Sequence, residues 1–174
     1  MSLVYLLASL PMLTYGRAPQ ITVAAFAEAC ASALSAKDAA CAAALAAGAP
    51  CDHPAARQWQ DLEAAIDGAI GRCRLARRAQ GGGEFAAPET AACPVWLTRM
   101  VDAAFEGAPD PLAREEALDR ARWAAADELG GFDPLAKGQV FAYAVRLRLA
   151  ARRAALDAAQ GRERLEAALP KQTL

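Results

Sequence analysis

Apolar residues recur at steps of three and four along most of this chain, which is the spacing of an α-helix. The clearest stripe lies within 55–78, at Trp59, Leu62, Ala65 or Ile66, Ala69 or Ile70, Cys73 and Ala76 or Arg77. A second stripe, in the segment from 135 to about 169, comprises Val140, Ala144, Leu147, Ala151, Ala154, Ala158 and Leu165. We therefore predict two long amphipathic helices, each burying one face.

Hydroxyl side chains indicate the starts of two shorter helices. Thr22 and Ser35 each precede an apolar segment, and their oxygens can accept hydrogen bonds from the free amides of a first helical turn. We expect one helix over 23–34 and a second from Ser35 to about residue 47. Asp38 would stand at the third position of that second helix, where the positive end of the helix dipole favours an anion.

Proline and glycine divide the rest of the chain. We expect a helix over 94–105, a break at 107–111, and a helix over 112–129 that two glycines close. Asp133 is predicted to cap the last helix and Pro134 to open it. Gly138 and Gly161 are expected to weaken the two ends of that helix.

These elements predict an all-α fold, a multi-helix bundle with a long C-terminal helix. The Gly-rich linker 81–87 separates an N-terminal helical half, 1–80, from a C-terminal helical half, 88–174, and we expect the two to share one core. The apolar run at the N-terminus ends at Pro11, well short of the roughly 20 residues that cross a bilayer. It also lacks the basic region of a signal peptide, so we expect it to be a first element buried in the core.

Composition supports helix and limits the classes of function. The chain is rich in alanine, the best helix former, and its formal net charge of -1 gives no long-range field that would steer it to nucleic acid. Its five cysteines are too widely spaced for a CxxC pair. That pattern favours buried thiols in a reducing compartment, and we expect a cytoplasmic protein.

His53 is the only histidine, so a histidine-dependent catalytic site would have to be built around it. It lies in the proline-containing break 50–54, two residues after Cys51. Two such ligands fall short of the four that a zinc site usually needs. We interpret His53 as a solvent-facing loop residue or a helix cap. We expect no catalytic residue, metal or cofactor, and an enzyme site near Asp52 and His53 is the weakest of the hypotheses.

A group of charged residues surrounds a tryptophan in the segment 112–129. Glu115, Asp119, Arg122 and Trp123 are spaced to lie along one side of a helix. We expect them to fasten this helix to the last one and to be structural rather than catalytic. Trp123 would be buried, and Glu115 or Asp119 would pair with an arginine such as Arg146.

Two clusters of basic residues require an explanation. Arg72, Arg74, Arg77 and Arg78 end the first long helix, where cations complement the negative end of the helix dipole. The second cluster lies on the flanks of the last helix, at Arg146, Arg148, Arg152 and Arg153. Helix-end compensation and salt bridges to the acidic segment 106–128 are one interpretation of these arginines, and contact with the acidic surface of a protein partner is another. A face that binds nucleic acid or another anionic ligand is the alternative, although no lysines and aromatic residues are interleaved with the arginines.

Three segments together resemble a known family. The opening Tyr-Leu-Leu-Ala-Ser-Leu-Pro-Met-Leu of 5–13 is similar to that family's first signature, and Asp-Pro-Leu at 110–112 with Glu115, Leu118-Asp119 and Arg122-Trp123 is similar to its second. The stretch 132–161 resembles its terminal helix, and Trp59 and Arg72 fall where the family has a Trp and an Arg. The chain departs from the pattern at Asp110, where Asn is usual, and at Arg152-Arg153, which replaces an aromatic-containing stretch. The family is a bacterial domain of unknown function encoded in V-type ATPase operons.

This resemblance implies a protein partner. A chain of this family would be a non-catalytic component, or an accessory or assembly protein, of a proton- or sodium-translocating V-type ATPase. It could be a stalk subunit akin to the funnel-shaped subunit that joins the stalk to the membrane ring. It would meet the membrane only through the complex, and no catalytic residue carries over from the family.

Overall fold

The computed structural model describes residues 2–79 and 93–156, and these residues form helices, turns and loops without a strand. The all-α helical bundle predicted from the sequence is thus confirmed. In chain order the helices are α1 (Leu3–Ser9), α2 (Val23–Ala33), α3 (Ala36–Ala47), α4 (Pro54–Ala79), α5 (Val95–Gly107), α6 (Pro111–Ala125), α7 (Asp127–Gly130) and α8 (Lys137–Ala154).

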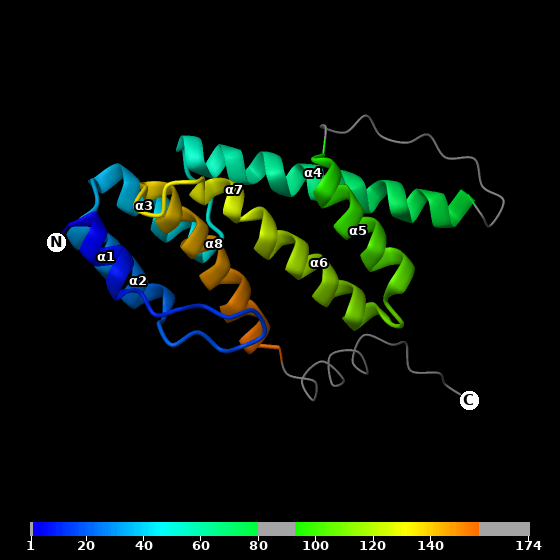
Figure 1. Ribbon diagram of the computed structural model, residues 1–174, viewed down its shortest axis with the longest axis horizontal. Helices are drawn as coiled ribbons and strands as arrows, with labels where there is room; N and C mark the ends of the chain where they lie inside the picture. Colours follow the sequence, from blue (N-terminus) through cyan, green and yellow to red (C-terminus); the bar gives the residue numbers. More distant parts are fainter. Residues whose placement is uncertain (1, 80–92, 157–174) are drawn as a thin grey trace, which may run out of the picture.

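The bundle is organised around α8. This helix contacts α1, α3, α6 and the short α7, while α2 packs against α1 and α3 (Figure 1). The long α4 runs along one edge, where α5 and α6 pack against it and against each other. Because neighbouring helices surround α8, residues outside the predicted stripe are also buried, among them Phe141, Val145 and Leu149. Ala154, which we predicted to be buried, is exposed, and Ala158 and Leu165 lie outside the described residues.

The predicted caps of α2 and α3 are confirmed. The Thr22 hydroxyl accepts a hydrogen bond from the amide of Ala25 at 3.1 Å, and the Ser35 hydroxyl accepts one from the amide of Asp38 at 3.2 Å. The predicted cap of the last helix is wrong. Asp133 accepts from the Leu135 amide at 2.9 Å in a preceding turn, and α8 begins only at Lys137, after Ala136 at the N-cap.

The predicted helix 112–129 is divided at Ala126 into α6 and α7. The break lets the end of α7 cross the start of α8 at close range. A Cβ atom added to Gly138 would lie 2.2 Å from the carbonyl oxygen of Leu129, which is backbone and cannot turn aside. Gly138 therefore permits the crossing of α7 and α8, a role that its place at a weak helix end did not reveal.

One hydrophobic core joins residues on both sides of residue 80. Its largest fully buried side chains include those of Leu6, Phe26, Trp59, Ile66, Leu97, Leu118 and Leu147. Cys30 and Cys41 are buried within it, and burial raises the pKa of the Cys30 thiol to about 11 and that of the Cys41 thiol to about 12. The remaining three cysteines are only half-buried, and the linker predicted at 81–87 lies outside the described residues.

The first helix lies on the surface of the bundle and not inside it. Leu6 is the residue of α1 that is buried, whereas Val4 and Tyr5 are exposed. The expectation of a buried first element is therefore wrong for most of its side chains. Within the described ranges, no helix combines the length and the apolar character that crossing a membrane requires.

Candidate functional site

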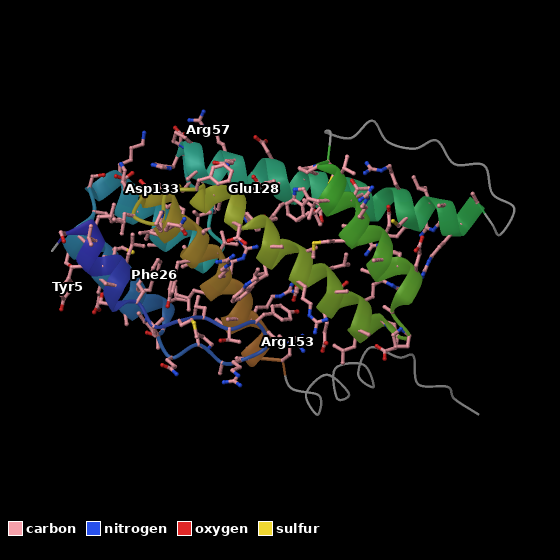
Figure 2. All side chains as sticks on the ribbon, viewed as in Figure 1. Tyr5, Phe26, Arg57, Glu128, Asp133 and Arg153 are labelled. Atoms are coloured by element: carbon pink, nitrogen blue, oxygen red, sulfur yellow. The ribbon has the colours of Figure 1, made fainter. Side chains whose placement is uncertain are left out.

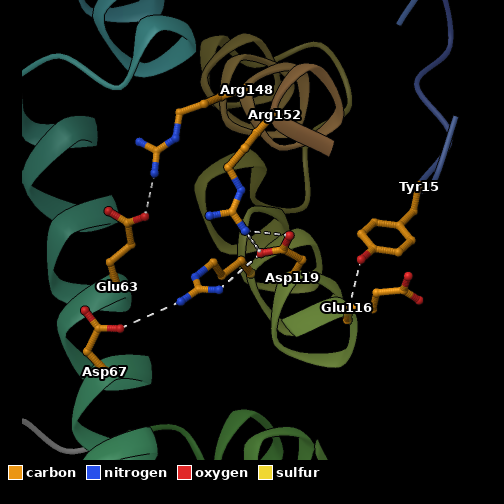
Figure 3. A network of polar contacts seen from close by, with 8 residues as sticks. Tyr15, Glu63, Asp67, Glu116, Asp119, Arg148 and Arg152 are labelled. Atoms are coloured by element: carbon orange, nitrogen blue, oxygen red, sulfur yellow. Dashed lines mark hydrogen bonds and ion pairs between the residues drawn. The ribbon is translucent and has the colours of Figure 1, made fainter. Parts of the chain in front are cut away.

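Every cation of α8 forms an ion pair with a carboxylate from another helix. The pairs are Lys137 with Asp38 of α3, Arg146 with Asp127 of α7, Arg148 with Glu63 of α4, and Arg152 and Arg153 with Asp119 and Glu116 of α6. Figure 3 shows the part of this network between α4, α6 and α8. The ion pairs thus connect the central helix to four of its neighbours.

Asp119 is the most buried carboxylate in this network, with only 3% of its surface exposed. One Nη atom of Arg152 lies 2.7 Å from both of its oxygens, and Arg122, one turn away on α6, donates to it at 3.1 Å. The other end of the Arg122 guanidinium reaches Asp67 of α4 at 3.8 Å (Figure 3). A buried carboxylate with three charge-assisted contacts is satisfied, so this site holds α4, α6 and α8 together.

The predicted link between α6 and α8 uses a different arginine. Asp119 pairs with Arg152, whereas Arg146 pairs with Asp127 and points its Nε at the carbonyl oxygen of Trp123, 3.4 Å away. The Arg146 guanidinium also lies 5.5 Å from the centre of the Trp123 ring. Trp123 is half-buried and not buried as predicted. Glu115 is exposed and forms no ion pair with any residue that the structure describes.

Tyr15 joins this network from the loop between α1 and α2, which the sequence did not indicate. Its ring meets Trp123 edge to face at 5.6 Å, and its hydroxyl donates to the carbonyl oxygen of Glu116 at 2.8 Å. The guanidinium groups of Arg120 and Arg153 lie 5.4 and 5.6 Å from its centre. Burial raises the pKa of the Tyr15 hydroxyl. Tyr15 thus anchors the N-terminal loop to α6.

A second polar cluster surrounds Asp38 at the start of α3, where the carboxylate accepts from Ser35 at 2.7 Å, Lys137 at 3.0 Å and His53 at 3.3 Å. The Ser35 hydroxyl, followed by Lys137, holds the pKa of Asp38 below its ordinary value. The other ring nitrogen of His53, Nδ1, accepts from the amide of Ala55 at 3.1 Å, so Nε2 is the protonated nitrogen that faces Asp38.

His53 is therefore a capping residue at the start of α4, one of the two interpretations we gave it. The other interpretation, a solvent-facing residue, is wrong, because only 12% of its side chain is exposed. Asp52, its neighbour, lies on the surface and pairs with Arg57 at 3.0 Å. Among the residues that the structure describes, no three His, Cys, Asp or Glu side chains are grouped as a metal site would require. The carboxylate of Asp38 serves to join α3, α8 and the loop before α4.

Large apolar side chains are exposed near the start of α8. A groove of about 300 Å³ is lined by the apolar side chains of Leu7, Leu10, Pro11, Met12, Leu13 and Pro134 and by the polar side chains of Gln139, Tyr143 and Arg146. We call it the apolar groove after the first set. Met12 is 86% exposed, and Phe132, two residues before Pro134, is fully exposed. Tyr5 projects from α1 away from the bundle (Figure 2). The Tyr143 hydroxyl donates to the carbonyl oxygen of Pro11 at 2.8 Å, which fixes one wall of the groove.

Comparison of the chain with protein-family models, curated proteins and solved structures finds no match. The relationship to the family of V-type ATPase operons therefore stays a prediction from the sequence.

Proposed function

We propose that this protein is a non-catalytic component that binds another protein through the apolar groove and the side chains beside it. The observation that carries the proposal is the exposure of Met12, which lines the groove, and of Phe132, which precedes the groove residue Pro134 by two positions in the chain. Apolar side chains exposed together commonly belong to a surface that a partner covers. A methionine suits such a surface because its unbranched thioether adapts to the shape of the partner.

The groove is formed before a partner arrives. Tyr143 belongs to α8 and is hydrogen-bonded to the Pro11 carbonyl, and its ring stacks on Phe26 at 5.4 Å. These contacts hold the loop after α1 against the central helix. A preformed surface loses little conformational freedom on binding, so more of the buried apolar area contributes to affinity.

As the partner we propose a subunit of a V-type ATPase in the cytoplasm. The support is the resemblance described above, together with one coincidence of position. The opening segment 5–13, which carries the first family signature, also supplies five residues of the apolar groove, Leu7, Leu10, Pro11, Met12 and Leu13. A stalk subunit and an assembly factor would both use such a surface.

Affinity purification of the tagged protein from its native host tests this proposal. We expect ATPase subunits to be recovered with the unchanged protein and lost with Met12→Asp and with Phe132→Asp. Val95→Asp is the matched control, because Val95 is 69% exposed at the start of α5 and lies outside the groove. Circular dichroism melting of all three variants checks that each remains folded.

Two outcomes count against the proposal at different levels. Recovery of no ATPase subunit with the unchanged protein would remove the partner that we name. If ATPase subunits are recovered equally well with Met12→Asp and Phe132→Asp, the proposed binding surface would be contradicted. A coupled, intact ATPase in cells that lack this protein would exclude the stalk-subunit version, and slow assembly of that ATPase would favour the assembly factor.

The alternative function, a nucleic-acid or anionic-ligand face at 146–153, is weakened by the ion pairs of α8. Arg146, Arg148, Arg152 and Arg153 each have a carboxylate partner, so an incoming phosphate would have to displace a contact that holds two helices together. We therefore do not adopt this alternative.

A further inference from the structure

A second group of arginines surrounds a pocket at the C-terminal end of α4. The pocket has a volume of about 360 Å³ and lies between α4 and the turn that joins α5 to α6. Its lining residues are Arg74, Arg77 and Arg78 of α4, Phe105 of α5, and Pro111, Arg114, Glu115 and Leu118 of α6. Pockets of about 300 Å³ and above are large enough for a small molecule.

Two of these guanidinium groups are held in place by Phe105. The groups of Arg77 and Arg114 each lie 5.2 Å from the centre of its ring, and Arg77 also donates to the Phe105 carbonyl oxygen. Phe105 itself is only 5% exposed, so it is a fixed part of the core. The fold thus positions two like charges from different helices around one buried ring.

No carboxylate among the described residues pairs with any of the four arginines of this pocket. Glu115 lies on the wall but forms no such pair. The Nε atom of Arg114 is shielded from solvent and has no hydrogen-bond acceptor among the described residues. A shielded donor without an acceptor costs stability, and a bound anion that accepts from it would remove that cost.

The negative end of the α4 dipole does not account for this charge. A helix end carries about half an elementary charge, far less than the four guanidinium groups around the pocket. Nucleic acid also fits poorly, because the Phe105 ring is buried and offers no exposed face on which a base could stack. Planar guanidinium groups converging on one small volume match the oxygens of a phosphoryl group.

We propose that this pocket binds the phosphoryl group of a small phosphorylated molecule, held by Arg74, Arg78 and Arg114 while Arg77 and Phe105 fix the wall. The site is separate from the apolar groove and does not depend on the function proposed above. Free phosphate, pyrophosphate and a phosphate ester all present a phosphoryl group with two or more negative charges, and that group is what we expect the pocket to bind.

Isothermal titration calorimetry on the full chain tests the site, with inorganic phosphate, pyrophosphate and glycerol phosphate as the three probes. We expect saturable binding of at least one probe at one site per chain, weakened by added salt. Arg78→Gln and Arg114→Gln should each weaken binding about tenfold, the value of one charge-assisted hydrogen bond. The order of the three affinities distinguishes free phosphate from an ester.

Arg57→Gln is the matched control. Arg57 lies at the opposite end of the same helix, on the surface, and should leave binding unchanged. The proposal is overturned if no probe binds saturably, or if Arg57→Gln weakens binding as much as Arg78→Gln does. A tri-glutamate peptide that binds where pyrophosphate does not would also overturn it, and would make the pocket a contact for an acidic protein segment.

Discussion

The arginines of α8 and two arginines at the end of α4, Arg74 and Arg78, have opposite surroundings. Each cation of α8 meets a carboxylate, because α8 lies at the centre of the bundle and α3, α4, α6 and α7 all present acidic residues to it. The end of α4 extends past the bundle (Figure 1), and beyond Ile70 the helix has no fully buried residue in its described length. The two clusters look alike in sequence, so neighbours and not residue type decide whether a charge is structural or free to bind.

The strongest test of the ion pairs of α8 removes the carboxylate of Asp119, which is the most buried one. Asp119→Asn should lower the free energy of unfolding by about 3 kcal/mol, the lower end for breaking a buried pair, because Arg152 is half-exposed and keeps some hydration. The measurement is the midpoint of urea unfolding, with the slope of the transition as a check on two-state behaviour.

Asp67→Asn is the control for that experiment. Asp67 also contacts Arg122, but 72% of its side chain is exposed, so its loss should cost less than about 1 kcal/mol. Equal losses in the two variants would contradict the view that burial makes the Asp119 pairs important.

The cluster at the other end of α8 should respond to pH. Asp38 has a pKa below its ordinary value of 3.8, so its carboxylate stabilises the fold above that value and the contribution fades as pH falls through the folded pKa. Asp38→Asn should therefore cost about 1–2 kcal/mol at pH 7 and much less near pH 3. Urea unfolding at both pH values measures the difference.

Asp52→Asn serves as the comparison, because 93% of the Asp52 side chain is exposed and its pair with Arg57 lies on the surface. We expect it to change stability little at either pH. A cost of Asp38→Asn that stays constant between pH 7 and pH 3 would show that the charge of Asp38 is not what stabilises α3 against α8.

The smallest effect should come from Arg78 at the end of α4. Arg78→Gln is expected to change the free energy of unfolding by less than about 0.5 kcal/mol, because Arg78 is exposed and forms no ion pair with a described residue. Arg152→Gln removes the same charge from the ion pairs of α8 and should cost about 1–2 kcal/mol. Thermal melting of the two variants compares them directly, and a larger loss for Arg78→Gln would reverse the distinction between the clusters.

Local chemistry explains which parts of the fold could be predicted. The caps at Thr22 and Ser35 act on amides three residues away, and the stripe from Trp59 to Ile70 follows from helix geometry alone. The predictions were wrong where contacts between residues far apart in the sequence overrode a local signal. Asp133 and Pro134 look like a helix start, but in the structure they form a turn before α8, which then crosses α7 at Gly138.

Parts of the candidate sites could be named from the sequence, but not their partners. Asp119, Arg122 and Arg146 were predicted to be structural, and Asp127 lies in the acidic segment that was predicted to pair with the arginines of α8. Tyr15 and Glu63 were missed because they lie on other elements. The arginines at the end of α4 were identified as a cluster, and their pocket was not. The missing information is the position of Phe105 and Arg114, which come from helices across the bundle.

The sequence by itself determined that this chain is helical and where most of its helices begin and end, because periodicity and capping act within a few residues. Only the tertiary structure decided which charges meet, as with Asp38 and Lys137, which are 99 positions apart. It also decided that Gly138 permits a backbone crossing and that Met12 and Pro134 share a groove. Contacts of this kind depend on how the helices pack and in which register, and packing is set by the whole core rather than by any one segment.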